Sequence, residues 1–397
     1  MRRPRTWLTL ALVLAVAGMT AAVGGRLERG SAAPITIGAA VDLTSFMSPY
    51  DSAAVQAAIL EVKKINQRGG VLGRRLQVKV CNHQLDPAKG KACAAKLVAA
   101  GAVAVLTTCD VEFGAPATQE TINSGRLAIA SCVGTDEQGP KRFGAKGKLA
   151  FTLGNVAQDE GAAMAEYAIQ KGWKRAITVS DNLLEYFRDV VEAFTVRYKE
   201  LGGTIVLAES FTNGDKTISS VISRVNATQA DIIATSTTFG DWPAFMAGLR
   251  SLGNKTAVIN SWAGDGTFWY PKDPQVTNYY YVTYASIFGD DPDPDVRALV
   301  NELKKAGKPP ATGSFVTGAA AIDAIVAAIA RTGKTDGASL AKAFEGFQGL
   351  STISGNVSFS PALHAVFGRV YRVIRVENNK ARYVGLVSAK KPAKIKG

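Results

Sequence analysis

The chain has 397 residues, of which 47% are hydrophobic and 20% are charged, an ordinary composition for a globular protein of two or three domains. Its formal net charge is +13, but residues 1–33 and residues 390–397 each contribute +4, which leaves +5 for the body of the chain. This modest excess, without a basic stripe interleaved with aromatic residues, argues against a nucleic-acid partner.

The two ends of the chain differ from the body. Three arginines precede an apolar run over Trp7–Val23, the pattern of a secretory signal peptide. Two small-residue cleavage sites compete, one ending at Ala22 and one at Ala33, and an uncleaved anchor is the alternative because the run is nearly long enough to span a bilayer. We therefore expect residues 1–33 to be a signal peptide or N-terminal anchor, and the protein to be extracytoplasmic, secreted or membrane-anchored. The basic tail, residues 389–397, is expected to be disordered and to rest against anionic lipid or cell wall.

The first folded stretch predicts a right-handed βαβ unit. Apolar and small residues over Ile35–Val41 suit a strand that is covered on both faces. Ser48 is expected to cap a helix whose first turn carries Asp51, and the following strand, Leu76–Val80, must run parallel to the first. The loop Thr44–Tyr50 stays uncovered at the carboxyl end of the first strand, where open α/β sheets bind ligands.

The same alternation of strands and helices continues along the chain and predicts two parallel sheets. A connector rich in glycine and lysine, 139–148, separates the two series, and a hairpin around Asn378 and Asn379 closes the chain. The further strands are expected at 103–107, 127–130, 149–153, 176–180, 204–209, 231–235, 257–260 and 279–284. The further helices are expected at 87–100, 116–123, 159–171, 186–201, 218–226, 242–252, 296–304, 314–330 and 339–347.

All four cysteines, Cys81, Cys93, Cys109 and Cys132, lie in the first third of the chain, and an exported protein can oxidise them. Three pairings exist. In the predicted sheet the second strand flanks the first on one side, and the third and fourth strands follow on the other. Cys109 and Cys132 then end adjacent strands, while Cys81 ends the outer strand and Cys93 sits on the next helix. This favours the pairs Cys81 with Cys93 and Cys109 with Cys132 over the alternatives and over a zinc site, since no CxxC motif is present.

Catalytic motifs are absent from the sequence. It has no GxSxG elbow, no HExxH motif and no kinase motifs, and its only histidines are His83 and His364. Histidine base chemistry is therefore disfavoured, although carboxylates could replace it. We expect no catalysis, no cofactor and no metal.

Several short motifs carry a resemblance that spans residues 34–388. They are Ile35-Thr-Ile-Gly, Ser48-Pro-Tyr, Ile65-Asn-Gln-Arg-Gly-Gly-Val-Leu-Gly-Arg, Leu85-Asp-Pro-Ala-Lys, Lys96-Leu-Val, Tyr186-Phe-Arg-Asp-Val-Val-Glu-Ala-Phe, Ala263-Gly-Asp-Gly and Gly355-Asn-Val-Ser-Phe. In this order the chain resembles the type I periplasmic binding proteins of ABC importers, in the branch that binds leucine, isoleucine and valine, amides and urea.

The resemblance implies two α/β lobes with parallel central sheets, joined by three crossings. A ligand would be captured in the cleft, and closure about the hinge would present the closed form to permease subunits in the membrane, which work with cytoplasmic ATPases. The N-terminal lobe is expected at 34–153 and 283–355, and the C-terminal lobe at 154–282 and 356–388. A monomer is expected.

The resemblance also implies the ligand contacts. The family's contacts to a ligand carboxylate fall on the loop after Cys109 and on Ser131, Cys132, Val133, Gly134 and Thr135. The family's serine is replaced by Asp110, and Glu112 adds a second negative charge, which disfavours a leucine-type carboxylate. The family's acid that holds the ligand ammonium falls on Asp265. Together these matches favour a cationic or amine-bearing ligand with amide character.

Further contacts come from both lobes, and each has a structural alternative. Tyr186 aligns with a family tyrosine, and aromatic walls are expected among the remaining positions. Asp110 and Glu112 could instead cap the third helix, Asp265 could be a turn residue, and Phe315 could belong to a core helix face. The remaining predicted contacts are Ser45, Phe46, Tyr50, Val111, Thr238, Phe239, Trp262 and Phe315.

The sequence thus predicts an extracytoplasmic solute-binding protein that captures a small polar ligand, an amino acid, amide or amine, for an ABC importer. A ligand-sensing receptor ectodomain of the same fold is the first alternative. A carboxylate-based hydrolase on this scaffold is the second.

Overall fold

The computed structural model describes residues 33–396, and the structural statements below refer to these residues. The predicted signal peptide or anchor lies outside the described residues, apart from Ala33.

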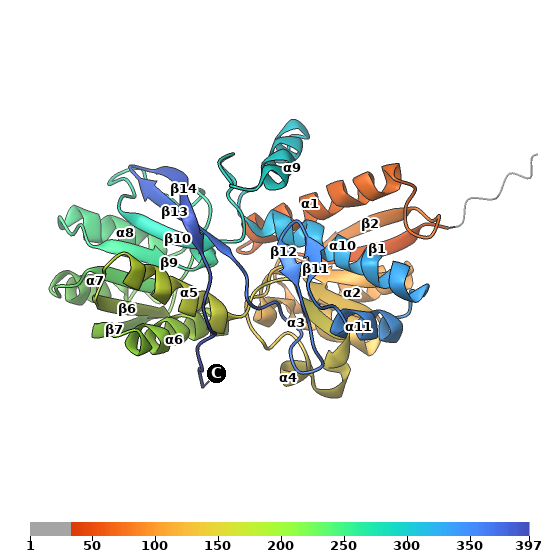
Figure 1. Cartoon of the computed structure of the whole chain (residues 1–397), viewed down its shortest axis with the longest axis horizontal. Coiled ribbons are helices and arrows are strands. Elements are labelled where there is room, and N and C mark those ends of the chain that lie inside the picture. Colours follow the sequence, from red (N-terminus) through yellow and green to blue (C-terminus); the bar gives the residue numbers. More distant parts are fainter. Residues whose placement is uncertain (1–32, 397) are drawn as a thin grey trace, which may run out of the picture. The chain divides into compact units, whose positions relative to one another are not determined.

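The first sheet has five parallel strands in the order β2-β1-β3-β4-β5 (Figure 1). This order confirms the prediction that β2 and β3 flank β1 on opposite sides. Apolar residues of α1, α10 and α11 form one core with the sheet, while α2 and α3 cover the other face. The elements are β1 Ile35–Val41, α1 Ser48–Gln67, β2 Leu76–Asn82, α2 Pro87–Ala99, β3 Ala102–Thr107, α3 Val111–Asn123, β4 Leu127–Ala130, β5 Ala150–Thr152, α10 Ser314–Thr332 and α11 Gly337–Glu345. We call this sheet and its helices the first lobe.

The second sheet has seven strands in the order β14-β13-β10-β9-β8-β6-β7. The strands from β6 to β10 are parallel, and the predicted C-terminal hairpin, β13 with β14, adds antiparallel to β10. Helices α5 and α6 pack on one face, and α7 and α8 on the other (Figure 1). The elements are α5 Ala157–Gln170, β6 Arg175–Asp181, α6 Glu185–Glu200, β7 Thr204–Phe211, α7 Ile218–Asn226, β8 Ile232–Ser236, α8 Trp242–Ser251, β9 Ala257–Asn260, β10 Tyr279–Thr283, β13 Tyr371–Glu377 and β14 Lys380–Val387. We call this sheet and its helices the second lobe.

The chain crosses between the two sheets three times, after β5, after β10 and before β13, as the resemblance implied. Helix α9, Pro294–Lys305, lies on the second crossing, and the small hairpin of β11, Leu350–Thr352, and β12, Gly355–Val357, precedes the third. Arg369, on the third crossing, is buried and donates to the carbonyl of Leu153 on the first crossing at 2.7 Å. Its guanidinium also lies 4.7 Å from the ring centre of Tyr284 on the second crossing. One cation therefore joins all three crossings.

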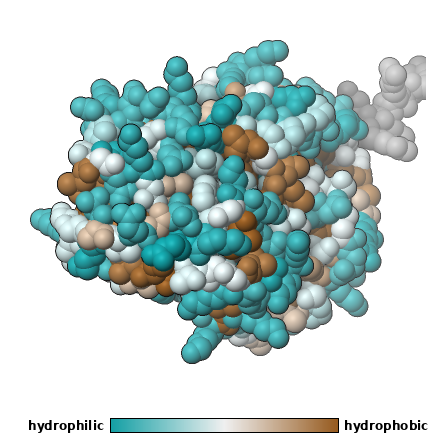
Figure 2. All heavy atoms as spheres, turned by 60° about the vertical axis from the view of Figure 1, so that its left-hand side comes forward, coloured by the Kyte–Doolittle hydropathy of each residue, from teal (hydrophilic) through white to brown (hydrophobic). Residues whose placement is uncertain are grey.

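Helix α10 meets the length and hydropathy expected of a membrane span, and among the described residues it alone does so. However, 67% of its apolar window is buried, and Ile322, Ile325 and Ile329 pack against the first sheet. These residues form a core-facing side of the helix. Figure 2 shows a face of the molecule on which hydrophilic side chains predominate and apolar ones form small separate groups, as is usual for a water-facing surface.

Two predicted helix starts are wrong. Ser48 is the first residue of α1 and not its cap, because Met47 precedes it in a helical conformation and no side chain caps this end. Helix α3 begins at Val111, five residues before Pro116, because Asp110 caps it through a 2.9 Å bond from the Phe113 amide. The connector over 139–148 holds a short helix α4, Pro140–Phe143, and a 3₁₀ helix, Gly144–Leu149.

The prediction of a disordered basic tail is wrong for its described part. The Lys390 amide donates to Glu166 at 3.0 Å, and the Lys391 ammonium lies 3.1 Å from Glu200. Ala393 is buried against α5, where its amide donates to Gln158. Carboxylates on α5 and α6, distant in sequence, thus balance the positive charge of the tail and hold it in place.

Candidate functional site

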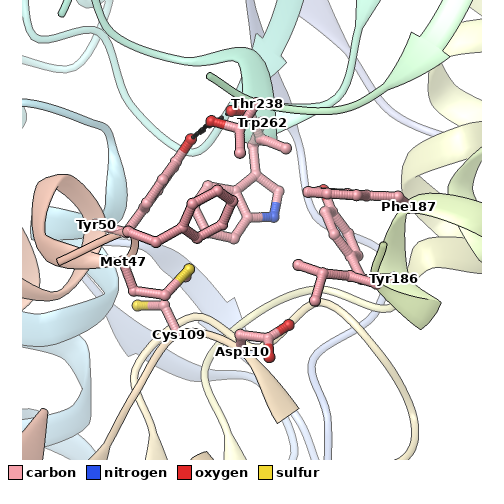
Figure 3. A pocket seen from close by; sticks show the side chains of 11 residues that line it. Met47, Tyr50, Cys109, Asp110, Tyr186, Phe187, Thr238 and Trp262 are labelled. Carbon is pink, nitrogen blue, oxygen red and sulfur yellow. Dashed lines mark hydrogen bonds between the residues drawn. The ribbon is translucent and has the colours of Figure 1, made fainter. Parts of the chain in front are cut away.

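The carboxyl ends of strands from both sheets meet at one small cavity (Figure 3). In the first lobe the lining comes from the loops after β1 and β3, and in the second lobe from the loops after β6, β8 and β9. Its volume is about 20 Å³, which is room for about one water molecule. A larger ligand must therefore enter while the lobes are apart. The lining residues are Phe46, Met47, Tyr50, Cys109, Asp110, Leu184, Tyr186, Phe187, Thr238, Trp262 and Ala263.

Two buried carboxylates shape the first-lobe side of the cavity. Asp42, at the end of β1, accepts hydrogen bonds from the amides of Ser45 at 2.8 Å and Met47 at 2.9 Å, which curls the loop back on itself. Asp51, on α1, accepts from the amides of Asp42 and Cys109, both at 2.8 Å. Burial raises the pKa of Asp51 to about 7, although both hydrogen bonds favour its ionised form. Asp51 thus ties the loop after β1 to the loop after β3.

Both predicted disulfides are confirmed. Cys109 is bonded to Cys132, so that the ends of β3 and β4 are joined beside the cavity, and Cys81 is bonded to Cys93 across β2 and α2. No cluster of potential metal ligands occurs among the described residues.

A third carboxylate, Glu160 on α5, orients the second-lobe side. Its two oxygens accept from the Trp262 amide at 2.7 Å and from the Tyr186 hydroxyl at 2.8 Å. Burial raises the pKa of Glu160 to about 8, against the effect of these two hydrogen bonds. Because Glu160 holds both partners, the rings of Tyr186 and Trp262 lie with their centres 6.0 Å apart along one wall.

Hydrogen bonds cross the cavity and hold the lobes together. The Tyr50 hydroxyl, from the first lobe, donates to the carbonyl of Ala263 and lies 2.6 Å from the Thr238 hydroxyl in the second lobe. Glu112, from the first lobe, accepts from the amide of Glu185 at 2.9 Å, at the start of α6. Carboxylates are favourable at a helix N-terminus, so this contact stabilises the closed arrangement.

Asp110 is the only aspartate, glutamate, lysine, arginine or histidine among the eleven residues that line the cavity. Asp110 is 5% exposed, and its carboxylate caps α3. Capping of this helix was the structural alternative predicted for Asp110. Burial raises the pKa of the Asp110 carboxyl well above its usual range, and the negative charge of Glu112 raises it further. Capping and a position in the cavity wall are thus combined in one side chain.

The structure brings part of the predicted contact set together. The predicted residues that line the cavity are Phe46, Tyr50, Cys109, Asp110, Tyr186, Thr238 and Trp262. Phe239 lies behind them, with its ring centre 4.3 Å from that of Phe46, and Gly134 contacts the Tyr186 ring so closely that a Cβ there would lie 2.5 Å from it. Phe239 and Gly134 therefore pack against lining residues without being part of the cavity lining themselves.

The other predicted contacts are placed elsewhere. The amide of Ser45 is bonded to Asp42, and Val111 and Val133 pack with Ala130 in a small core of their own. Ser131, Cys132 and Thr135 are buried but are not part of the cavity lining, and Phe315 is buried in the core as its structural alternative predicted.

Asp265 does not reach the cavity wall. Its carboxylate accepts from the Thr283 hydroxyl and the Gly313 amide, both at 2.6 Å, and from the amide of Gly266. Three donors of the protein thus occupy the oxygens that the resemblance assigned to a ligand ammonium. Asp265 instead fastens the loop after β9 to the second crossing.

Sequence reasoning missed four lining residues, Met47, Leu184, Phe187 and Ala263. Each lies within three residues of a predicted contact, and Leu184 follows β6, whose carboxyl end faces the same edge as β8 and β9. The signal that could have found them is the rule that all parallel strands of a sheet present their carboxyl ends to one edge.

Two parallel-sheet lobes, three crossings and a cavity between strand ends define a binding protein that closes around a small molecule. A family model described as periplasmic binding protein matches residues 34–381. The chain belongs to this family, and it is an extracytoplasmic solute-binding protein with a small-molecule ligand.

The individual relatives named here are distant in sequence, but the matched region covers most of each chain. The chain is 23% identical over 332 residues to the Leu/Ile/Val-binding protein homolog 3 of Brucella melitensis, which covers 83% of this chain and 88% of that protein. Among solved structures, the branched-chain amino acid transporter substrate binding protein LivJ of Streptococcus pneumoniae, in complex with isoleucine, has a TM-score of 0.76 at 17% identity and covers 89% of this chain and 99% of that chain. A solute binding protein of an ABC transporter from R. palustris, in complex with benzoate, has a TM-score of 0.73 at 18% identity and covers 91% of this chain and 99% of that chain.

The buried acids of the site predict that the folded state loses stability as the pH rises. Burial raises the pKa of Glu160 to about 8 and that of Asp51 to about 7, so the folded state binds more protons than the unfolded state, in which these groups titrate near 4. Stability from a raised pKa is present at low pH and is lost as the pH passes the folded pKa. The contribution of Glu160 alone amounts to about 2 kcal/mol between pH 6.5 and 8.5. Calorimetric melting should therefore show a falling Tm over this range.

The variant Glu160→Gln provides the control, because the amide keeps an acceptor for the Trp262 amide but does not titrate. Its Tm should fall less steeply with pH than that of the parent protein. A Tm that is constant or rises from pH 6.5 to 8.5 would contradict the prediction.

Proposed function

We propose that the chain captures a small polar ligand, an amino acid, amide or amine, in the cavity between the lobes and delivers it unchanged to the permease subunits of an ABC importer. The observation that carries this proposal is a cavity walled by strand ends of both sheets and bridged by Tyr50 and Glu112. A binding site split between two lobes allows the ligand to act as the link that closes them.

The proposal includes the lobe boundaries, residues 34–153 with 283–355 and residues 154–282 with 356–388. It also includes a monomeric, non-catalytic protein that is exported by residues 1–33 and is either secreted or anchored by them. Family membership supports export and the partnership with an importer. The ligand contacts proposed are Phe46, Tyr50, Asp110, Tyr186, Thr238 and Trp262.

Calorimetry with a panel of amino acids, amides and amines tests the proposal. We expect at least one compound to bind with a 1:1 stoichiometry and to be recovered chemically unchanged by mass spectrometry after overnight incubation. Trp262→Ala should weaken that binding about tenfold or more, since a buried aromatic contact is lost. Trp173→Ala is the matched control, because Trp173 packs against Tyr167 and Tyr280, outside the cavity lining. Turnover of the bound compound, or equal loss of binding in both variants, would contradict the proposal.

A further inference from the structure

The cavity wall contains an acidic side chain but no basic one. Asp110 contributes a buried carboxyl group, and no lysine, arginine or histidine is among the eleven lining residues. Glu112, two residues on, places a second carboxyl group beside it, so that the two acids repel each other when both are ionised and share a hydrogen bond when Asp110 holds a proton. A buried negative charge is costly unless a positive group pairs with it. No positive group of the cavity wall pairs with Asp110, and a cationic ligand would supply the missing positive charge.

The hydrogen-bond donors of the wall are largely committed to the protein itself. The Tyr186 hydroxyl donates to Glu160, the Tyr50 hydroxyl donates to the Ala263 carbonyl, and the Thr238 hydroxyl lies within hydrogen-bonding distance of Tyr50. The indole N–H of Trp262 remains without a hydrogen-bond partner. A single neutral donor does not offset the repulsion between a ligand carboxylate and Asp110, so the wall is unsuited to an anionic group.

Aromatic rings surround the position that Asp110 faces. Figure 3 shows the side chains of Tyr50, Trp262, Tyr186 and Phe187 arranged around the cavity, with Asp110 at its floor. The Tyr50 and Trp262 rings meet edge to face, with their centres 5.0 Å apart. The negatively polarised faces of such rings attract a cation, and several rings together with a carboxylate form the usual receptor for organic ammonium groups.

We propose that the ligand is an organic cation, an amine or quaternary ammonium compound without a carboxylate, whose positive group lies between Asp110 and the aromatic rings of the cavity. This inference rests on the proposed function, since it names the class of solute that the same cavity captures. The cation would compensate the carboxyl pair of Asp110 and Glu112, while its apolar part would occupy the space between Phe46 and Phe187 when the lobes close.

The test is calorimetric titration of the full-length protein with probes that differ mainly in charge. One set shares a branched five-carbon skeleton: 3-methylbutylamine as the cation, 3-methylbutan-1-ol as the neutral analogue, leucine as the zwitterion and 4-methylpentanoate as the anion. A second pair compares choline with its uncharged analogue 3,3-dimethylbutan-1-ol. We expect the cation of at least one set to bind tenfold or more tightly than its neutral analogue, and 3-methylbutylamine to bind more tightly than leucine.

Asp110→Asn separates ligand binding from helix capping. Asparagine caps a helix about as well as aspartate, so this variant keeps the hydrogen bond from the Phe113 amide but loses the negative charge. It should bind the preferred cation about tenfold or more weakly, the scale of a lost charge-assisted hydrogen bond. Asp336→Asn is the matched control, because Asp336 caps α11 in the same way, through the Ser339 amide at 2.9 Å, at an exposed site. It should bind like the parent protein.

The outcomes distinguish this inference from the function on which it rests. Tight binding of leucine or of 4-methylpentanoate, with the amine binding more weakly, would overturn the inference and leave the solute-binding function intact. Equal cation affinity in Asp110→Asn and the parent protein would overturn it as well. If neither cation binds at millimolar concentration the inference fails, and if the wider panel of amino acids, amides and amines also fails to bind, the proposed function fails with it.

Discussion

Asp51→Ala should lower the free energy of unfolding by about 2–6 kcal/mol and abolish ligand binding. Asp51 is 1% exposed, and its two oxygens are the acceptors for the amides of Asp42 and Cys109. Without them both amides are buried and unpaired, and each unpaired group costs about 1–3 kcal/mol. Because the two amides belong to loops that line the cavity, the loss should also disorganise the site. Urea unfolding and calorimetric titration measure the two effects.

Two further variants control this experiment. Asp51→Asn keeps one acceptor oxygen and should lie between the parent protein and Asp51→Ala in stability. Asp336→Ala removes an exposed helix cap and should cost about 1 kcal/mol, with binding unchanged. If Asp51→Ala unfolds at the same urea concentration as Asp336→Ala, the buried carboxylate does not have the role assigned to it.

Gly318→Ala should destabilise the first lobe by about 3 kcal/mol or more. Gly318 lies where α10 crosses α1, and a Cβ there would lie 2.0 Å from the carbonyl oxygen of Ala54. The obstacle is backbone, which cannot rotate away as a side chain could, so the helices must separate, and overpacking of this kind lies at the upper end of the usual range. The shift would reach the cavity, because Ser314 at the start of α10 donates to the carbonyl of Tyr50 on α1.

Gly90→Ala is the matched substitution, since Gly90 is also a buried glycine within a helix. The nearest atom to its added Cβ would be 3.6 Å away, on Pro116, which is ordinary contact. Alanine favours a helix over glycine by up to about 1 kcal/mol, so Gly90→Ala should be neutral or stabilising. Equal midpoints of urea unfolding for the two variants would contradict the close helix crossing.

Local rules predicted the fold well where each step depends on neighbours in sequence. The strand order around β1 followed from the βαβ unit, and the pairing of all four cysteines followed from that order. The rules failed where distant groups decide. The tail beyond Ala389 is held by carboxylates on α5 and α6. The early start of α3 has a local cause, because Asp110, one of the caps that the sequence offered, stands directly before the helix.

The site was predicted at the level of loops but not of side-chain direction. Strand ends identified the loops after β1, β3 and β4, and the resemblance added the loops after β8 and β9; all of these except the loop after β4 contribute residues to the cavity lining. Whether an acid in such a loop faces the ligand depends on donors elsewhere in the fold. The carboxylate of Asp265 accepts hydrogen bonds from Thr283 and Gly313, which lie 18 and 48 residues away in the sequence. Asp110, in contrast, lines the cavity. Sequence spacing does not contain this information.

A crystal structure of the protein with its tightest ligand from the calorimetric panel tests the central claim most directly. We expect the ligand to lie between the lobes, in contact with Asp110 on one side and with Trp262 on the other, and to be enclosed by the closed lobes. A ligand bound at any other surface, with Asp110 and Trp262 untouched, would contradict it.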